Sequence, residues 1–200
     1  FHFLVNPHSG GGAAAEAVVP VARVLRERGA RVAVTYSPGP QAVLQLASDA
    51  VAAGGVVVCV GGDGMVFSLV TRMSQLRDAG GVLGFVPAGR GNDFARMLGI
   101  PAEPAEIAER LLTQPVSRVD LIGCGDIDVA GSVYAGVDAQ AAAMVARMRR
   151  IPRALQYPLA GVRSIARYVP HRYRLEIDGE VREVEAATVV VANSGYYGAG

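Results

Sequence analysis

The chain has 200 residues, a formal net charge of +1 and 18% charged side chains, a length that suits one large domain or two small ones. This near-neutral charge argues against nucleic-acid binding driven by net positive charge, and we expect no nucleic-acid partner. All 19 basic side chains of the Lys and Arg group are arginine. The lack of lysine excludes a Walker-A loop, a protein-kinase strand lysine and a Schiff-base amine. Any phosphate chemistry must therefore use main-chain amides, arginine or metal.

The cysteines and the hydropathy pattern indicate the cellular setting. Cys59 and Cys124 stand alone, with no C-x-x-C spacing and no nearby histidine pair, so we expect two buried free thiols in a reducing compartment. No apolar run approaches the roughly 18 residues that span a bilayer. No basic residue precedes Arg23 to form the start of a secretory signal. We predict a cytoplasmic protein whose N-terminus, which begins at Phe1, has been trimmed.

The first 115 residues alternate between short apolar segments and amphipathic segments. The apolar segments are typical of buried strands, and apolar residues three or four positions apart are typical of helices. Parallel strands connected by helices form a sheet that is covered on both faces. We therefore predict a Rossmann-like α/β domain over residues 1–115. Its expected strands are 2–5, 31–36, 55–60 and 82–86, and its expected helices are 13–28, 41–53, 65–77, 92–99 and 104–113.

After Pro115 the pattern changes, because most apolar segments now have the β-branched composition of strands. Asp178-Gly179 separates two of these segments and favours a tight hairpin, since both central residues of a type I′ turn need a positive φ. We predict a second, mainly β domain over residues 116–200. Its expected strands are 117–122, 127–137, 172–178 and 181–192, and its expected helices are 139–150 and 155–169.

Three glycine-rich loops each follow a predicted strand, and the carboxyl ends of parallel strands meet at the edge of a sheet where ligands bind. The first loop is Asn6-Pro7-His8-Ser9-Gly10-Gly11-Gly12. Consecutive glycines let main-chain N–H groups approach an anion, and the N-terminus of the following helix adds a partial positive charge. The loop also fits a dinucleotide-binding G-x-G-x-x-A pattern, but Thr35 stands where that pattern requires a carboxylate. We therefore expect phosphate binding here.

The other two loops bring carboxylates and an arginine to the same edge. Gly61-Gly62-Asp63-Gly64 sets one carboxylate among glycines, where it can face Mg²⁺ or position a nucleotide. Aspartate is also a good helix N-cap, which is the structural alternative. The third loop, Pro87-Ala88-Gly89-Arg90-Gly91-Asn92-Asp93, offers Asn92 or Asp93 as the next N-cap. Arg90 could hold a phosphate through two hydrogen bonds.

These loops, in this order, resemble the diacylglycerol kinase catalytic domain family, which includes bacterial soluble lipid kinases and, more distantly, sphingosine and ceramide kinases. The first half carries the resemblance in Asn6-Pro7-x-Ser9-Gly10, Gly61-Gly62-Asp63-Gly64 and Pro87-Ala88-Gly89-x-Gly91-Asn92-Asp93-Phe94-Ala95-Arg96. The second half carries it in Val119-Asp120-Leu121, Gly136-Val137-Asp138-Ala139 and Val191-Ala192-Asn193-Ser194 with Gly198 and Gly200. NAD kinases and phosphofructokinases share the GGDG motif, whereas the ordered set is specific.

The resemblance implies an ATP-dependent lipid kinase, which transfers the γ-phosphoryl group to a hydroxyl of diacylglycerol or a related lipid. The implied site is a cleft between an α/β domain of the phosphofructokinase and NAD kinase type and a β-sandwich lipid-substrate domain. Asp63 would lie against the phosphates, while Asp93 and Asp120 would belong to an acidic network with Mg²⁺ and water, so these three are the expected catalytic residues. Asp93 and Asp120 are the expected metal ligands. The residues expected to bind ATP are Asn6, Ser9, Gly10, Thr35, Gly61, Gly62, Asp63, Gly64, Met65, Val66, Phe67, Arg90, Gly91 and Asn92.

The chain departs from the family pattern at several positions. The family usually has threonine after GGDG and then, one residue on, Asn-Glu, where this chain has Met65, Phe67 and Ser68. The usual threonine of the third motif is Arg90. The resemblance also implies that the proposed general base, a carboxylate, and the last strands lie beyond Gly200. We therefore expect the β domain to be truncated at its C-terminus.

A basic segment between Ala139 and Leu175 contains eight arginines and no acidic residue. Such a surface can dock on anionic lipid headgroups, each arginine contributing about 1 kcal/mol near the membrane. The alternative is a solvated face whose charge partners include Glu176, Glu180 and the glutamates that follow. A peripheral position at the inner membrane face and a homodimer both stay open. The arginines are Arg147, Arg149, Arg150, Arg153, Arg163, Arg167, Arg172 and Arg174.

Two other function classes are compatible with the sequence. A kinase with a soluble substrate, of the NAD kinase or phosphofructokinase type, is favoured by GGDG alone and disfavoured by residues 87–96. A nucleotide-binding module without catalysis is favoured by Met65 and by a general base that lies beyond Gly200.

Overall fold

The computed structural model describes residues 1–37, 39–89, 91–148, 159, 161–162, 169–193 and 195–196. Contacts among Cα atoms divide the chain into two compact units. The first unit contains Phe1–Ser132 and the described residues after Val191, and the second contains the described part of Val133–Val191. Among the described residues, none of the helices has the length and apolar character needed to cross a membrane.

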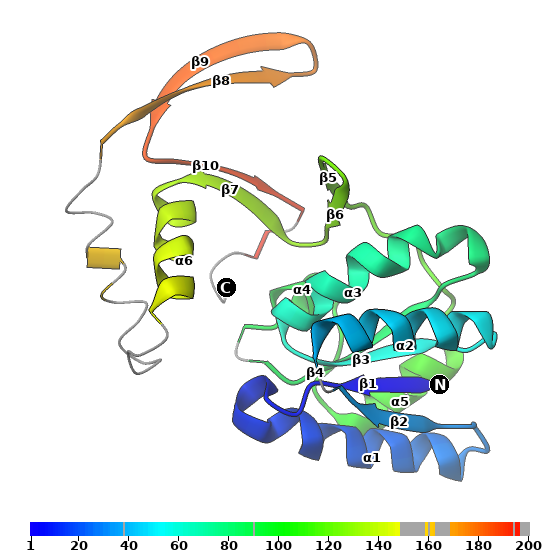
Figure 1. Cartoon of the computed structure of the whole chain (residues 1–200). Coiled ribbons are helices and arrows are strands. Elements are labelled where there is room, and N and C mark those ends of the chain that lie inside the picture. The colour runs from blue at the N-terminus through cyan, green and yellow to red at the C-terminus, as the bar shows by residue number, and fades with distance from the viewer. Residues whose placement is uncertain are drawn as a thin grey trace. The chain divides into compact units, whose positions relative to one another are not determined.

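A four-stranded parallel sheet forms the centre of the first unit, in the order β2-β1-β3-β4 (Figure 1). The strands are β1 (His2–Val5), β2 (Ala33–Tyr36), β3 (Val57–Gly61) and β4 (Leu83–Pro87). Every residue of β3 is buried, because this strand has a neighbour on each side and helices over both faces. The four strands predicted in this half are confirmed, with small shifts at their ends.

Consecutive strand residues point into two separate cores, one on each face of the sheet. Leu4 and Cys59 belong to the first core, whereas Phe3 and Val58 belong to the second. Side chains alternate between the two faces of a strand, and both faces are covered here. This double burial explains why these strands are continuously apolar in sequence.

The connecting helices provide the other side of each core (Figure 1). The first core contains residues of α2 (Pro40–Ala52), α3 (Asp63–Gln75) and α4 (Asp93–Met97), and the second contains residues of α1 (Ala13–Glu27) and α5 (Pro104–Thr113). In α1 the buried residues Val18, Val21, Ala22 and Leu25 recur three or four positions apart. The helix ends before Gly29, which has a φ of +81° and so terminates the helical main chain.

A short antiparallel hairpin, β5 (Ile122–Cys124) and β6 (Ile127–Val129), packs on α3 within the first unit. Thr71 donates from Oγ1 to the carbonyl of Asp128 at 2.6 Å. The ring of Phe67 lies so close to Gly131 that a Cβ on this glycine would come within 2.6 Å of it. These contacts attach the hairpin to the α/β unit, so the boundary between the units lies at Ser132, whereas the sequence predicted it at residue 116.

The described part of the second unit contains the helix α6 and two pairs of strands. The elements are β7 (Ser132–Gly136), α6 (Val137–Arg147), β8 (His171–Ile177), β9 (Glu180–Ala186) and β10 (Thr188–Ala192). β7 pairs with β10, and β8 pairs with β9 as an antiparallel hairpin. The predicted turn at Asp178-Gly179 is confirmed, since these residues have φ values of 51° and 84°.

Some strand predictions for the second half are wrong in extent. Residues 117–121 are not in a strand, and the predicted strand 127–137 is two strands separated at Ala130-Gly131, where the chain packs against Phe67. The predicted strand 181–192 is interrupted at Ala187, whose carbonyl accepts a hydrogen bond from the Val137 N–H at 3.0 Å at the start of α6. The predicted helix 155–169 lies mostly outside the described residues.

Candidate active site

The three glycine-rich loops follow β1, β3 and β4 at the carboxyl edge of the sheet. The strand order places β2 on one side of β1 and both β3 and β4 on the other, so the winding direction reverses between β1 and β3. Open parallel sheets bind ligands outside the carboxyl ends of the strands at such a switch point. The topology therefore brings two of the predicted loops directly to this point and the third beside it.

The first loop is a tight turn followed by three left-handed glycines. The Asn6 Oδ1 accepts a hydrogen bond from the His8 N–H at 3.0 Å, and the Asn6 carbonyl accepts one from the Ser9 N–H at 3.1 Å. Pro7 occupies the second position of this turn, where its fixed φ is favourable. The glycines at 10–12 have φ values of 60°, 75° and 110°, which strain any other residue. The loop thus presents bare main chain at the entrance to α1.

Contacts between atoms of different loops hold the three together. The Ser9 Oγ accepts a hydrogen bond from the Gly62 N–H at 3.3 Å and so joins the first loop to the second. The Gly61 carbonyl accepts one from the Ala88 N–H at 2.9 Å and joins the second loop to the third. Gly10 lies so close to Ala88 that a Cβ on Gly10 would be 2.6 Å from the Ala88 carbonyl oxygen. The three predicted loops are therefore in mutual contact.

The closest approach between loops is that of Gly62 and Gly89. A Cβ on Gly62 would lie 2.9 Å from the Gly89 Cα, and a Cβ on Gly89 would lie 2.5 Å from the Gly62 Cα. Protein interiors are packed as closely as organic crystals, so neighbouring main-chain atoms have no free space into which they could move to relieve such an overlap. Glycine is therefore required at both positions by packing of main chain on main chain, independently of any ligand.

Asp63 is the first residue of α3, and its carboxylate reaches the next helix. Its Oδ1 accepts a hydrogen bond from the Phe94 N–H in the first turn of α4, at 3.3 Å. The N-cap of α3 is Gly62, which offers no side chain. Asp63 therefore caps the neighbouring helix, and its negative charge lies beside the positive end of the α4 dipole.

Asn92 shapes the third loop. It is the N-cap of α4, one of the two caps predicted, and has the left-handed conformation φ 55°, ψ 39°. Its side chain turns back to Gly89, because its Oδ1 accepts a hydrogen bond from the Gly89 N–H at 2.8 Å and its Nδ2 donates to the Gly89 carbonyl at 3.0 Å. This double hydrogen bond closes the loop around Gly91. Arg90 lies outside the described residues.

Asp93 is the first residue of α4 and is half-buried. Its Oδ1 lies 3.8 Å from Nη1 of Arg96, one turn along the helix. Since Phe94 follows it directly and binds Asp63, the two carboxylates flank the start of the same helix. The structure therefore brings together two of the three predicted catalytic aspartates.

Three residues predicted to bind ATP have side chains that face the protein. Met65 and Val66 are buried in the first core, and Phe67 packs on Gly131. Ligand contacts of Met65 and Val66 would therefore come from main-chain atoms. Thr35 is half-buried on β2, where it pairs with Leu4 near the carboxyl end of the strand.

Asp120 lies outside the three loops, in the exposed segment before β5. Its carbonyl accepts a hydrogen bond from Nδ2 of Asn193. Within the described ranges, no three His, Cys, Asp or Glu side chains gather as a metal-binding group. Mg²⁺ often binds through one or two carboxylates together with substrate phosphates, so the two predicted ligands, Asp93 and Asp120, suit it without a third protein ligand. The metal-binding roles of Asp93 and Asp120 stay predictions.

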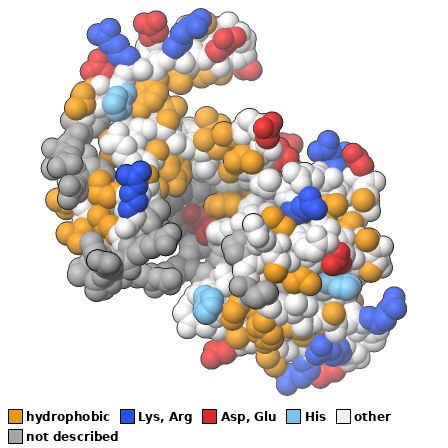
Figure 2. Space-filling model, viewed as in Figure 1, with side chains coloured by type: hydrophobic (Ala, Val, Ile, Leu, Met, Phe, Trp, Pro, Cys, Tyr) orange, Lys and Arg blue, Asp and Glu red, His pale blue; other side chains and the backbone are white. Residues whose placement is uncertain are grey.

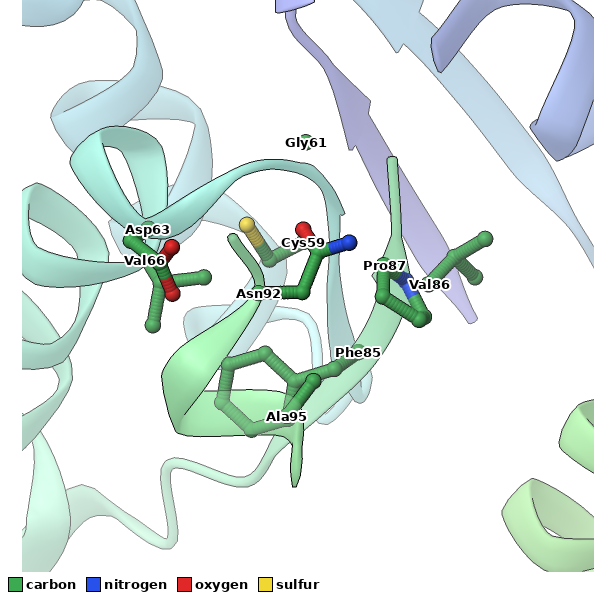
Figure 3. Close-up of a pocket in the computed structure, with 9 residues that line it drawn as sticks. All are labelled: Cys59, Gly61, Asp63, Val66, Phe85, Val86, Pro87, Asn92 and Ala95. Atoms are coloured by element: carbon green, nitrogen blue, oxygen red, sulfur yellow. The ribbon is translucent and has the colours of Figure 1, made fainter. Parts of the chain in front are cut away.

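A small cavity lies beneath the second and third loops (Figure 3). Its volume of about 10 Å³ has room for about one water molecule. Figure 3 shows the polar ends of Asp63 and Asn92 and the Cys59 sulfur around it. A nucleotide does not fit inside this cavity.

The two cysteines are free, as predicted, but only one is buried. Burial raises the pKa of the Cys59 thiol far above its usual range, so this side chain stays neutral and unreactive. Cys124 is exposed at the end of β5, so the prediction of burial is wrong for this residue.

Arg147, Arg172 and Arg174 are the described members of the basic segment. The Arg172 Nε lies 3.8 Å from the Glu185 Oε2, and Arg174 is opposite Glu183 in the register of β8 and β9. Figure 2 shows basic and acidic side chains intermixed at the top of the view, where Figure 1 labels β8 and β9. A charge partner within the hairpin, as in the second of the two alternatives, is therefore found for Arg172, and Arg174 has an acidic residue opposite it in the register. The members outside the described residues are Arg149, Arg150, Arg153, Arg163 and Arg167.

Two family models match the chain. Residues 1–124 match the diacylglycerol kinase catalytic domain, and residues 131–200 match the YegS C-terminal NAD kinase beta sandwich-like domain. The chain belongs to the diacylglycerol kinase catalytic domain family. The predicted fold class, a parallel α/β sheet followed by a β-sandwich-like domain, is confirmed together with the predicted family.

Individual relatives extend beyond this chain. A Chromohalobacter salexigens protein named as a YegS-like lipid kinase is 33% identical over 179 residues, covering 88% of this chain and 58% of that protein. The diacylglycerol kinase of Mycobacterium tuberculosis strain H37Rv is 31% identical over 205 aligned residues, covering 98% and 65%. The crystal structure of a diacylglycerol-kinase-like protein from Bacillus anthracis strain Sterne has a TM-score of 0.80 at 22% identity, covering 99% and 66%. The chain thus spans between 58% and 66% of the length of these proteins.

Proposed function

We propose that this chain supplies the nucleotide site and part of the lipid site of an ATP-dependent kinase that phosphorylates a hydroxyl of diacylglycerol or a related lipid. The observation that carries the proposal is the mutual contact of three glycine loops at the switch point of the sheet, in a chain that has no lysine. Bare main chain at the starts of α1 and α3 suits phosphate groups. The relatives named as lipid kinases support the class of acceptor.

The proposed reaction moves one phosphoryl group. The hydroxyl oxygen of the lipid bonds to the γ-phosphorus while the bond from this phosphorus to the β–γ bridging oxygen breaks, so ADP leaves and the hydroxyl proton passes to a base. Such a transfer depends on positioning and on neutralising phosphate charge, so glycine amides can replace a lysine. Magnesium bound with ATP supplies charge neutralisation, and Asp93 and Asp120 are the residues that would hold it.

Asp63 would lie closest to the phosphates of the bound nucleotide. Its hydrogen bond to the Phe94 N–H fixes the carboxylate in one orientation. A carboxylate repels phosphate groups unless a cation lies between them, so a carboxylate held in this way would act on the phosphates through Mg²⁺ bound with ATP. The loops around it carry glycine on both sides, which leaves the main chain accessible to the ligand.

Incubation of the full-length protein with γ-labelled ATP and Mg²⁺ tests the proposal. Diacylglycerol, a sphingoid base and NAD are offered in separate reactions, and Asp63→Asn is the negative control. We expect label in diacylglycerol or the sphingoid base and none in NAD. Label in NAD alone would favour a kinase with a soluble substrate, and label in no acceptor would favour a nucleotide-binding module without catalysis.

A further inference from the structure

Asn193 contacts the main chain of the first unit at two places that flank the β5–β6 hairpin. Its side-chain Nδ2 donates to the carbonyl of Asp120 and makes a longer contact of 3.4 Å with the carbonyl of Ala130. Its main-chain N–H donates to the carbonyl of Gly131 at 3.0 Å. One half-buried residue thus contacts both ends of the segment that contains the β5–β6 hairpin.

This segment has its other attachments on α3, the helix that begins with Asp63. The Thr71 Oγ1 bonds to the Asp128 carbonyl, and the ring of Phe67 packs on Gly131. Leu121, the residue after Asp120, packs against the first core. The main chain at Asp120 is therefore held by the packing of Leu121 on the first core and by the Asn193 amide.

The Asn193 contacts need an amide group. A carboxamide nitrogen has two N–H donors, and here both point to main-chain carbonyls. Aspartate has the same shape but no donor, and its charge would face the carbonyl oxygens of Asp120 and Ala130. The chain can therefore be tested at this position with a change that preserves volume and removes only the donors.

We infer that Asn193 is a positioning residue for Asp120 and holds its main chain in the place that phosphoryl transfer requires. The inference rests on the proposed function, because it assigns Asp120 a part in the transfer. ATP binding is assigned to the three loops, whose mutual contacts do not involve Asn193. The loss of Asn193 should therefore act on turnover and leave the affinity for ATP in place.

The test compares Asn193→Asp and Asn193→Ser with Thr188→Val in the full-length protein. Thr188 also donates from its side chain to a main-chain carbonyl, that of Ala135 at 3.0 Å, and lies on β10 just before Asn193. We expect Asn193→Asp to lower kcat at least tenfold with a KM for ATP within twofold of the wild type. Asn193→Ser keeps one donor and should lose less, and Thr188→Val should change kcat by less than twofold.

Two further measurements separate positioning from a general loss of stability. Added to Asp120→Asn, the Asn193→Asp change should lower kcat no further, because both act through one group. Amide hydrogen exchange of residues 118–131 should become at least tenfold faster in Asn193→Asp, with residues 61–64 unchanged. A wild-type kcat, an additive loss in the double variant or unchanged exchange would overturn the inference. If the wild-type protein phosphorylates no lipid, the proposed function fails, and unchanged or faster exchange still decides whether Asn193 holds the segment.

Discussion

The carboxylate of Asp63 accepts a hydrogen bond from the main-chain N–H of Phe94 at 3.3 Å, across 31 residues of sequence. This contact joins the second glycine loop to the helix that follows the third. An aspartate between glycines suggests a ligand contact or a cap of its own helix, and here it caps the next helix along. Asp63 therefore has a structural role in addition to the catalytic role proposed for it.

Asparagine and alanine at position 63 should separate these two roles. Asp63→Asn keeps an oxygen acceptor for the Phe94 N–H, so we expect its free energy of unfolding to fall by less than about 1 kcal/mol. Asp63→Ala leaves this N–H without its acceptor and should cost about 1–2 kcal/mol. Both should lower phosphoryl transfer at least 100-fold, because both remove the negative charge that would face Mg²⁺ bound with ATP. Urea unfolding and the labelled-ATP assay measure the two effects, and wild-type turnover in Asp63→Asn would remove the carboxylate from the mechanism.

Alanine substitutions at three glycines of the second and third loops should differ in their effect on stability. Gly62→Ala and Gly89→Ala each bring a Cβ within 3.0 Å of the other residue's Cα, and we expect each to destabilise the protein by about 1–3 kcal/mol. Gly64→Ala is the matched control, because a Cβ there meets nothing within 4 Å and the residue lies in the first turn of α3. It should leave stability unchanged or raise it by up to about 1 kcal/mol. Thermal unfolding of the three variants tests this, and equal losses in all three would contradict the close packing of the loops.

The conformation of Asn92 leads to a third prediction. Asn92→Gly tolerates the left-handed φ but loses both hydrogen bonds to Gly89, and should cost about 1–2 kcal/mol. Asn92→Ala adds the strain of a Cβ in this region and should cost about 1 kcal/mol more. The order of the two unfolding midpoints checks the prediction. Alanine as stable as glycine would show that the left-handed main chain is not maintained.

Much of the first unit could be predicted from the sequence, because its strands are buried on both faces and therefore stand out as apolar runs. The position of the loops follows from the parallel topology, which places the carboxyl ends of β1, β3 and β4 at one edge. The burial of Met65 and Val66 was also open to prediction. Together with Leu69, Val70 and Met73 they form the apolar stripe of α3, a helical periodicity that the glycine motif obscures.

The contacts that could not be predicted join distant residues. The Asp63 and Phe94 contact depends on how closely β3 and β4 bring their loops together. The contact of Asn193 with Asp120 forms because the chain returns to the first unit after β10. Local propensity carries no signal for either contact. The break at Gly131 is different in kind, since a glycine inside a strand pattern is a recognised signal of interruption.

The β8–β9 hairpin yields a prediction on membrane binding. Residues 171–186 contain Arg172, Arg174 and Arg182 together with five acidic side chains, so this hairpin has no net positive charge. We expect the double change of Arg172 and Arg174 to glutamine to leave co-sedimentation with anionic liposomes within twofold of the wild type. The measurement is made at several salt concentrations, because electrostatic binding weakens with ionic strength. A marked loss would show that the hairpin arginines bind the membrane despite their acidic neighbours.

Cys59 predicts a dependence of stability on alkaline pH. Its pKa is raised by burial in the folded protein, whereas an unfolded cysteine titrates at about 8.5. Above that pH the unfolded chain loses a proton that the folded chain keeps, so stability falls by up to about 1.4 kcal/mol per pH unit. Below it the contribution is fully present. The wild type should therefore lose about 2 kcal/mol more than Cys59→Ala between pH 8 and pH 10.

Urea unfolding at the two pH values measures this difference, with Cys124→Ala as the exposed-thiol control that should behave like the wild type. Because the chain has no lysine, fewer other groups titrate in this range, and equal losses in the wild type and Cys59→Ala would mean that the thiol is not buried in the folded protein.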